Sequence, residues 1–310
     1  MQNRRYNTFG DWLNRWTGYK VQKISVNAGF TCPNRDGTIG WGGCTYCNNQ
    51  TFNPAYCKNN KSITLQLKEG RDFFGKKYPQ MKYLAYFQAY TNTYGELDEL
   101  KRKYEEALAA DDVVGLVIGT RPDCVSVQLL DYLEQLNRRC QLLVEYGIES
   151  TDDEVLRHIN RGHDFNTTRH MIEKTAERGI ATGGHIILGL PGTYEISGYV
   201  QTEAANISSM PLTTLKIHQL QIICQTKMAE EFRAFPQRFH RYSVGEYIDT
   251  VIDFIELSRP DLVFERFVSQ SPLELLAVSG WGLKNFEFTA KLDKRMEQRG
   301  AFQGKKFKTR

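Results

Sequence analysis

A chain of 310 residues with 41% hydrophobic residues, 25% charged residues and a net charge of +4 has the composition of a folded globular protein, and it is long enough for one barrel-sized domain with an appendage or for two domains. No apolar run approaches the roughly 18 residues of a membrane span, and the first residues lack the apolar stretch of a secretory signal. We therefore expect a cytoplasmic protein without a membrane partner, in which the seven cysteines stay reduced.

The predicted elements alternate in the way that is typical of a parallel sheet with helical crossovers. A basic arm over residues 1–20 comes first. Six short β-branched or aromatic runs then predict strands at residues 21–26, 83–87, 113–118, 142–146, 184–188 and 215–220. Residues 96–110 illustrate the helices between them, because their leucines and one tyrosine form a single apolar stripe.

The loop after the first predicted strand holds three cysteines, Cys32, Cys44 and Cys47, among glycines. A cysteine loop at the end of a strand is typical of an active site. Three interpretations are open: the thiols are reduced structural side chains, they form a closed zinc site with Cys57 as fourth ligand, or they bind three corners of a cubane iron–sulfur cluster whose fourth iron stays open.

Polar or glycine-rich segments also follow the next four predicted strands, at residues 88–93, 119–123, 147–150 and 189–192. Because the carboxyl ends of parallel strands meet at one edge, we expect these segments and the cysteine loop to build one pocket.

Individual residues near the strand ends have competing interpretations. The carboxylate of Glu145, at the end of a buried strand, is costly unless it is paired, which predicts a cationic ligand beside it. Ser150 either contacts that ligand or begins a helix. Arg121 and Asp123 either hold a carboxylate or form a structural turn, and His185, within a predicted strand, is more typical of a satisfied core histidine.

After residue 220 the pattern changes. Residues 229–310 hold a predicted helix at 244–258, a short strand at 262–268, a Gly-Trp-Gly turn at 280–282 and a basic tail. The tail, residues 291–310, has eight Lys or Arg against two acidic residues, a net of +6 that leaves −2 for the rest of the chain. It predicts either an arm that follows phosphates, with aromatic side chains for stacking, or a solvated chain end.

Two segments of the cysteine loop carry a resemblance to a known family. Cys-Pro-Asn-Arg-Asp-Gly-Thr at residues 32–38 and Gly-Gly-Cys-Thr-Tyr-Cys at residues 42–47 resemble the cluster loop of radical S-adenosylmethionine enzymes of the YtqA/YhcC type. Eleven residues separate Cys32 from Cys44, whereas the commonest superfamily spacing is C-x3-C-x2-C. The longer spacing is similar to that of the branch that includes the catalytic subunit of Elongator.

The resemblance implies a fold and a set of cofactors. The fold would be α/β, an open partial (β/α)6 barrel over residues 21–228 followed by a small C-terminal α+β domain over residues 229–310. Cys32, Cys44 and Cys47 would hold one 4Fe-4S cluster, and S-adenosylmethionine would bind the open iron. An electron donor such as flavodoxin or ferredoxin would supply the electron that cleaves S-adenosylmethionine to a 5′-deoxyadenosyl radical.

The resemblance also implies which residues contact S-adenosylmethionine. Thr91 and Asn92 occupy the place of a glycine-glycine-glutamate-type segment, although the glycines are missing here and the run is also a plausible helix cap. Arg161, in Asn-Arg-Gly-His at residues 160–163, matches another family segment. The full set is Gly43, Tyr46, Thr91, Asn92, Arg121, Glu145, Glu149, Ser150, Arg161, Leu190 and Pro191.

The substrate is implied by the resemblance alone. Proteins of this type are tied to the wobble uridine of tRNA, so we expect remodelling of a side chain on that base, with tRNA as partner. The basic start and tail agree with an RNA partner. Two alternatives stay open, a zinc-dependent barrel enzyme and an RNA-binding protein with a structural metal site.

Overall fold

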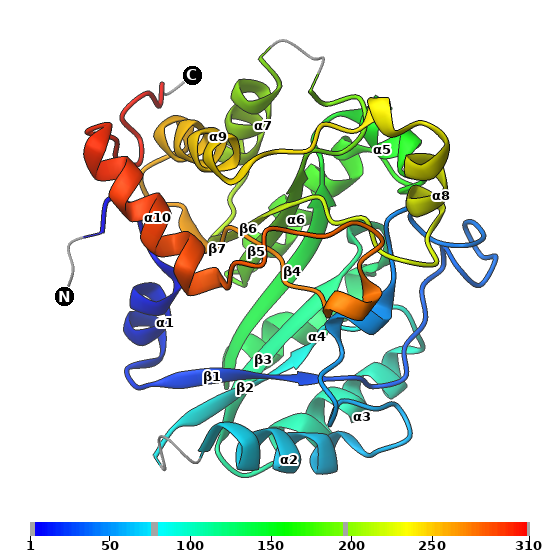
Figure 1. The fold of residues 1–310 in the computed structure, drawn as a ribbon. Helices are drawn as coiled ribbons and strands as arrows, with labels where there is room; N and C mark the ends of the chain where they lie inside the picture. The colour runs from blue at the N-terminus through cyan, green and yellow to red at the C-terminus, as the bar shows by residue number, and fades with distance from the viewer. Residues whose placement is uncertain (1–3, 76–79, 195–197, 309–310) are drawn as a thin grey trace.

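The centre of the molecule is one sheet of seven parallel strands, in the order β1 to β7. The computed structural model describes residues 4–75, 80–194 and 198–308. The strands are β1 (Val21–Val26), β2 (Lys82–Phe87), β3 (Val113–Thr120), β4 (Gln141–Glu149), β5 (Ala181–Leu188), β6 (Thr214–Gln219) and β7 (Val263–Arg266). Each pairs in parallel with the next, and Figure 1 shows the sheet curled. The predicted α/β partial barrel is therefore confirmed.

Helices α2 to α9 lie between successive strands, α1 precedes β1 and α10 follows β7 (Figure 1). They are α1 (Phe9–Thr17), α2 (Ile63–Gly75), α3 (Leu97–Leu108), α4 (Val127–Asn137), α5 (Asp153–His158), α6 (Phe165–Ala176), α7 (Tyr199–Ser209), α8 (Lys227–Ala234), α9 (Val244–Leu257) and α10 (Asn285–Gln298). Short 3-10 helices lie at Asn49–Phe52, Pro122–Cys124, Pro236–Arg238 and Leu273–Leu275. Within the described residues, no helix has the length and apolarity to cross a membrane.

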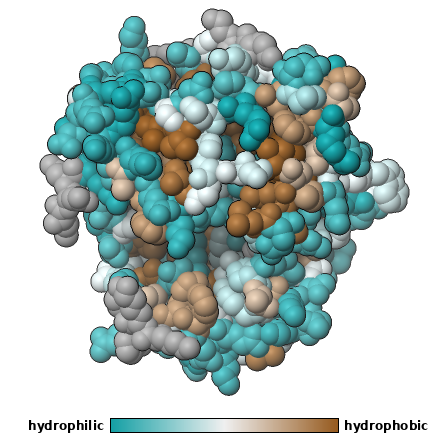
Figure 2. Space-filling view, viewed as in Figure 1, coloured by the Kyte–Doolittle hydropathy of each residue, from teal (hydrophilic) through white to brown (hydrophobic). Residues whose placement is uncertain are grey.

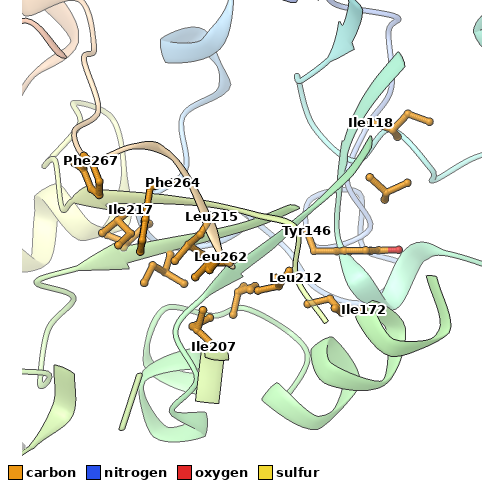
Figure 3. Packing of buried hydrophobic residues seen from close by; sticks show 14 of the residues in the cluster. Ile118, Tyr146, Ile172, Ile207, Leu212, Leu215, Ile217, Leu262, Phe264 and Phe267 are labelled. Carbon is orange, nitrogen blue, oxygen red and sulfur yellow. The ribbon is translucent and has the colours of Figure 1, made fainter. Parts of the chain in front are cut away.

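The seventh strand comes from the segment that the sequence pattern assigned to a separate C-terminal domain. β7 pairs with β6 because α9 forms one more crossover helix between them, with a long apolar face. Figure 3 shows Phe264 of β7 near Leu215 and Ile217 of β6, all within one buried cluster. The strand predicted at residues 262–268 is thus present, but it is the seventh strand of the barrel sheet, which continues past residue 228.

The N-terminal arm is a folded element. Thr8 caps α1 by accepting a hydrogen bond from the backbone N of Asp11, and Phe264 N donates to Asn7 O at 2.9 Å, which fixes this segment beside β7. Leu13 of α1 belongs to a second buried cluster with side chains of β2, β3 and β4, which lies on the opposite face of the strands from the main core. The described part of the segment predicted as a basic arm, residues 1–20, is therefore packed against the sheet and β7.

Most of the predicted basic tail is also folded. α10 buries Phe288, Leu292 and Met296 completely, and these positions repeat every four residues, as on one helix face. Arg295 and Arg299 form ion pairs with Asp249 of α9. Lys305 and Lys306 similarly pair with Glu256. Four of the eight tail cations therefore hold α10 and the chain end against α9, which corrects the prediction of an arm free to follow phosphates.

Candidate active site

All three loop cysteines line one cavity at the carboxyl ends of the strands. Seven of the eleven residues predicted to contact a cofactor line the same cavity, namely Gly43, Tyr46, Thr91, Arg121, Glu145, Glu149 and Arg161. They come from the segments after β1, β2 and β3, from β4 itself and from the segment after α5, in agreement with the expectation of one pocket built from several strand ends.

Glycines and backbone hydrogen bonds shape the cysteine loop. Gly42 and Gly43 have φ angles of +80° and +79°, which favour glycine. A Cβ at Gly43 would lie 2.8 Å from Arg35 Nε, so the arginine packs where a side chain would be. Thr45 N donates to Ile159 O at 2.9 Å, and Asn34 Nδ2 donates to Asn160 O at 2.6 Å. The loop is therefore anchored on the segment that follows α5.

Two arginines bring positive charge to the thiols. Arg161 Nη1 donates to Cys44 Sγ at 3.6 Å, and Arg35 Nη2 donates to Cys47 O at 2.6 Å. Burial and the neighbouring Cys44 raise the pKa of Cys47 to about 11, while Arg35 opposes this rise. Binding of a metal group must therefore displace protons, and the two guanidiniums favour the thiolate forms that result.

A β-bulge directs Glu149 into the cavity. The register between β4 and β5 pairs Gly147 with His185 and then Glu149 with Ile186, so one residue of β4 is extra. Glu149 has a φ of +67°, an uncommon conformation for a residue with a side chain. His185 Nδ1 lies 3.2 Å from its carboxylate. Although burial opposes ionisation, His185 and Arg161 lower the pKa of Glu149 to about 2.

Glu145 is paired by the protein itself. Its carboxylate oxygens lie 2.7 Å from Lys23 Nζ and 2.6 Å from Lys216 Nζ, and the hydroxyl of Tyr86 donates to it at 2.7 Å. Glu265 of β7 lies 2.9 Å from Lys23 and 3.3 Å from Lys216, which completes a closed ring of alternating charges. The expected cationic ligand is thus not needed to neutralise Glu145, because two lysines from β1 and β6 already do so.

Arg121 keeps one nitrogen free. Its guanidinium forms a forked pair with Asp123, with Nε–Oδ1 at 2.9 Å and Nη2–Oδ2 at 2.8 Å. The third nitrogen, Nη1, is buried without a hydrogen-bond partner. A buried donor without an acceptor is costly, so this nitrogen fits a ligand oxygen in the cavity.

Four predicted contact residues lie outside the cavity. Asn92 Nδ2 donates to the backbone oxygens of Phe87 and Gly119, which joins the ends of β2 and β3. Ser150 donates a hydrogen bond to buried Glu203 of α7, and Asp152 caps α5. Ser150 therefore belongs to the segment that leads into α5. Leu190 is buried in the main core, and Pro191 lines a different hollow near α5.

The comparisons with known proteins agree with this arrangement. The family model described as "Radical SAM superfamily" matches residues 30–196, and the model of the radical SAM C-terminal domain matches residues 212–298. The chain belongs to the radical SAM superfamily.

Known relatives are similar to this radical SAM chain over nearly its whole length. It is 34% identical to the uncharacterised protein YtqA of Bacillus subtilis, over 98% of this chain and 93% of that protein. It is 33% identical to protein YhcC of Escherichia coli, over 95% of this chain and 93% of that one. The archaeal Elp3 structure from Methanocaldococcus infernus has a TM-score of 0.69 at 18% identity, covering 91% of this chain and 64% of that one, and supports the fold.

The family implies a 4Fe-4S cluster and S-adenosylmethionine, and the residues present fit both groups. Three thiols share one cavity with arginines beside them, and the free Nη1 of Arg121 is available to an anionic oxygen. The proposed fourth zinc ligand, Cys57, is buried outside this cavity and directs its thiol to Asn53. Burial also raises the pKa of Cys57 to about 12.

A second, larger cavity of about 440 Å³ lies at the ends of β5 and β6 of this radical SAM protein. Leu188 of β5 and Gln219 of β6 line this second cavity. Each lies three residues after a residue of the same strand, His185 or Lys216, that lines the first cavity. Tyr242 and Trp281 contribute aromatic walls, and Figure 2 shows apolar surface gathered on this face of the molecule. Its size and lining suit a planar heteroaromatic group.

Sequence reasoning missed three polar residues on the inner face of the sheet, Lys216, His218 and Arg266. Lys216 and Arg266 line the cysteine cavity, and His218 Nε2 contacts His185 Nε2. The alternation Lys216-Ile217-His218 was the available signal, since polar residues at every second position of a buried strand share one face. His185, expected to be a core residue, lines the cavity.

Proposed function

We propose that the protein cleaves S-adenosylmethionine reductively and uses the resulting radical to remodel the side chain of a tRNA wobble uridine. The observation that carries the first part is the grouping of Cys32, Cys44 and Cys47 in one cavity with two arginines. A cluster bound there would supply the electron for cleavage to a 5′-deoxyadenosyl radical. An electron donor such as flavodoxin or ferredoxin would serve it.

The residues of the chain then have distinct roles in binding. Arg121 offers its free nitrogen to the carboxylate of S-adenosylmethionine. Glu149, held ionised, offers acceptors to the ammonium or the ribose hydroxyls. The aromatic cavity at the ends of β5 and β6 suits the adenine ring. Arg35 and Arg161 stabilise the thiolates.

Glu149 gives a direct test of cofactor binding. Glu149→Gln keeps the shape of the side chain and removes its charge, so the affinity for S-adenosylmethionine should fall about tenfold or more, on the order of 1.5–3 kcal/mol for a charge-assisted bond. Iron content should not change. Glu154→Gln, on the exposed side of α5, is the matched control. An unchanged dissociation constant by equilibrium titration would remove Glu149 from the binding site.

The tRNA part of the proposal rests on the Elongator-like resemblance and on basic residues of the C-terminal segment. Lys291, Lys294 and Lys308 are exposed and form no ion pair with any described residue. Replacing all three with glutamate should weaken tRNA binding. The salt dependence of binding should also flatten, by nearly one unit of log-log slope for each phosphate that the variant no longer neutralises.

This charge reversal replaces a deletion of the tail, because deletion would remove the buried face of α10. The same three-residue reversal at Lys58, Lys68 and Arg102, which are also exposed, is the control. Binding measured by filter retention at several salt concentrations should be lower for the first variant alone. Equal affinities and slopes for both variants would direct the search to other surfaces or to small-molecule substrates.

A further inference from the structure

Arg266, at the last position of β7, lines the cysteine cavity. The register between β6 and β7 pairs Leu215 with Phe264 and then Lys216 with Arg266, so Glu265 is the extra residue of a bulge. Neighbouring residues of a regular strand point to opposite faces. The bulge allows both Glu265 and Arg266 to reach the inner face of the sheet, where they contact lysines and His218 respectively.

The other positive charges of the cavity already face a carboxylate or the cysteine loop, although Arg121 Nη1 and Arg161 Nε have no hydrogen-bond partner. Arg35 and Arg161 face the cysteines, and Asp123 holds Arg121. Glu145 and Glu265 together neutralise Lys216. Within the described part of the chain these pairs account for every acidic side chain that lines the cavity except Glu149, which faces His185 and Arg161.

Arg266, like Arg35, forms no ion pair with any described carboxylate, but Arg35 donates a hydrogen bond to the cysteine loop whereas the one printed side-chain contact of Arg266 is to His218. Its Nη2 lies 3.5 Å from His218 Nε2, and its buried Nε has no hydrogen-bond partner. Arginine stays charged under all ordinary conditions and has five donors in a planar fork. A half-buried guanidinium with unused donors is therefore unfavourable until an acceptor reaches it.

We propose that Arg266 binds an oxyanion of the substrate, a phosphate or a carboxylate, within the cavity that holds the three cysteines. The inference rests on the proposed function, because it assigns this part of the cavity to the molecule on which the radical acts. The fork of Arg266 matches the two oxygens of either group. The carboxylate of S-adenosylmethionine has a separate partner in the free nitrogen of Arg121, which belongs to the segment after β3.

The test uses the cluster-bearing protein and two simple probes, inorganic phosphate and malonate. Thermal unfolding is followed over increasing concentrations of each, with sodium chloride added to hold ionic strength constant. A ligand that binds only the folded state stabilises it by RT ln(1 + L/Kd), where L is the free ligand concentration, so the unfolding midpoint rises as the ligand concentration increases. We expect the probe to raise the unfolding midpoint of the wild type, and to raise that of Arg266→Gln by at most half as much. Arg266→Lys, which keeps the charge but not the planar fork of donors, should recover part of the difference.

Arg102→Gln removes the same charge from the exposed face of α3 and should behave as the wild type. The probe that raises the unfolding midpoint of the wild type more, phosphate or malonate, identifies the class of oxyanion. No rise in the wild type, or equal rises in the wild type and Arg266→Gln, would overturn the proposal. Affinity for S-adenosylmethionine should be unchanged in Arg266→Gln, and a tenfold loss would assign Arg266 to the cofactor instead. Cleavage of S-adenosylmethionine without substrate tests the proposed function independently.

Discussion

Replacing Cys32, Cys44 or Cys47 with alanine is expected to abolish the bound iron and with it any cleavage of S-adenosylmethionine. Each thiolate would hold one corner of the cluster, and no other described cysteine lines the cavity to replace a lost ligand. Iron and sulfide analysis after anaerobic reconstitution measures the first effect. Separation of 5′-deoxyadenosine by chromatography measures the second.

Cys57→Ala is the matched control, because Cys57 is buried beside Asn53 and away from the cavity. It should keep about four iron atoms per chain, the content of one cubane cluster, and the brown colour. Retention of cluster in any one of the three loop variants would contradict the assignment of that residue. Loss of metal in Cys57→Ala as complete as in the others would instead favour a closed four-ligand site.

Local sequence patterns were sufficient to predict the sheet and the edge at which the cavity lies. The β-branched runs marked six strands because side chains packed on both faces of a parallel sheet require them. The loops then had to meet at one edge, whatever their own conformations, and Cys32, Arg121 and Glu149 all reach the same cavity. The parallel order of the strands therefore placed the site without any knowledge of side-chain contacts.

Interactions between distant segments explain what the sequence left unpredicted. Glu145 alone, at a buried strand end, indicates a missing cation but not its source. Lys23 and Lys216 lie 122 and 71 residues away in the chain, and only the curl of the sheet brings them to this carboxylate. Bulges at Glu149 and Glu265 have no distinct sequence pattern, since they arise from the pairing of neighbouring strands.

In the tail, by contrast, the sequence did contain the pattern of a buried helix face, but the basic residues around it favoured the interpretation as a phosphate-binding arm. Phe288, Leu292 and Met296 recur with the period of a helix, which indicates a buried face. The basic residues between them are typical of a phosphate-binding arm only when they lack acidic neighbours. α9 supplies those neighbours in Asp249 and Glu256.

The ring of charges around Glu145 changes what its substitution should do. A residue that neutralised S-adenosylmethionine would, when changed to glutamine, weaken cofactor binding about tenfold. In the structure the carboxylate holds Lys23 of β1, Lys216 of β6 and the hydroxyl of Tyr86. Through Glu265 the same lysines join β7 to β1, which are the two edges of the open sheet.

Glu145→Gln is therefore expected to lower the free energy of unfolding by about 3–5 kcal/mol, the cost of removing one partner from a buried ion pair. The folded fraction should keep its iron and its affinity for S-adenosylmethionine. Glu134→Gln on α4, which breaks surface pairs with Arg138 and Arg178, should change the free energy of unfolding by no more than about 1 kcal/mol. Urea unfolding followed by circular dichroism measures both.

The pH dependence of stability supplies a second, independent readout of the same ring. Although burial opposes ionisation, Lys216 and Lys23 lower the pKa of Glu145 well below its usual range. Its contribution is thus fully present above the unfolded pKa of about 4.3 and is lost as the pH falls below that value. The difference in free energy of unfolding between the wild type and Glu145→Gln should therefore shrink progressively below about pH 4. Two results would instead assign Glu145 to the cofactor site. One is a stability difference between the two proteins that stays constant down to pH 3, and the other is a weaker affinity of Glu145→Gln for S-adenosylmethionine with unchanged stability.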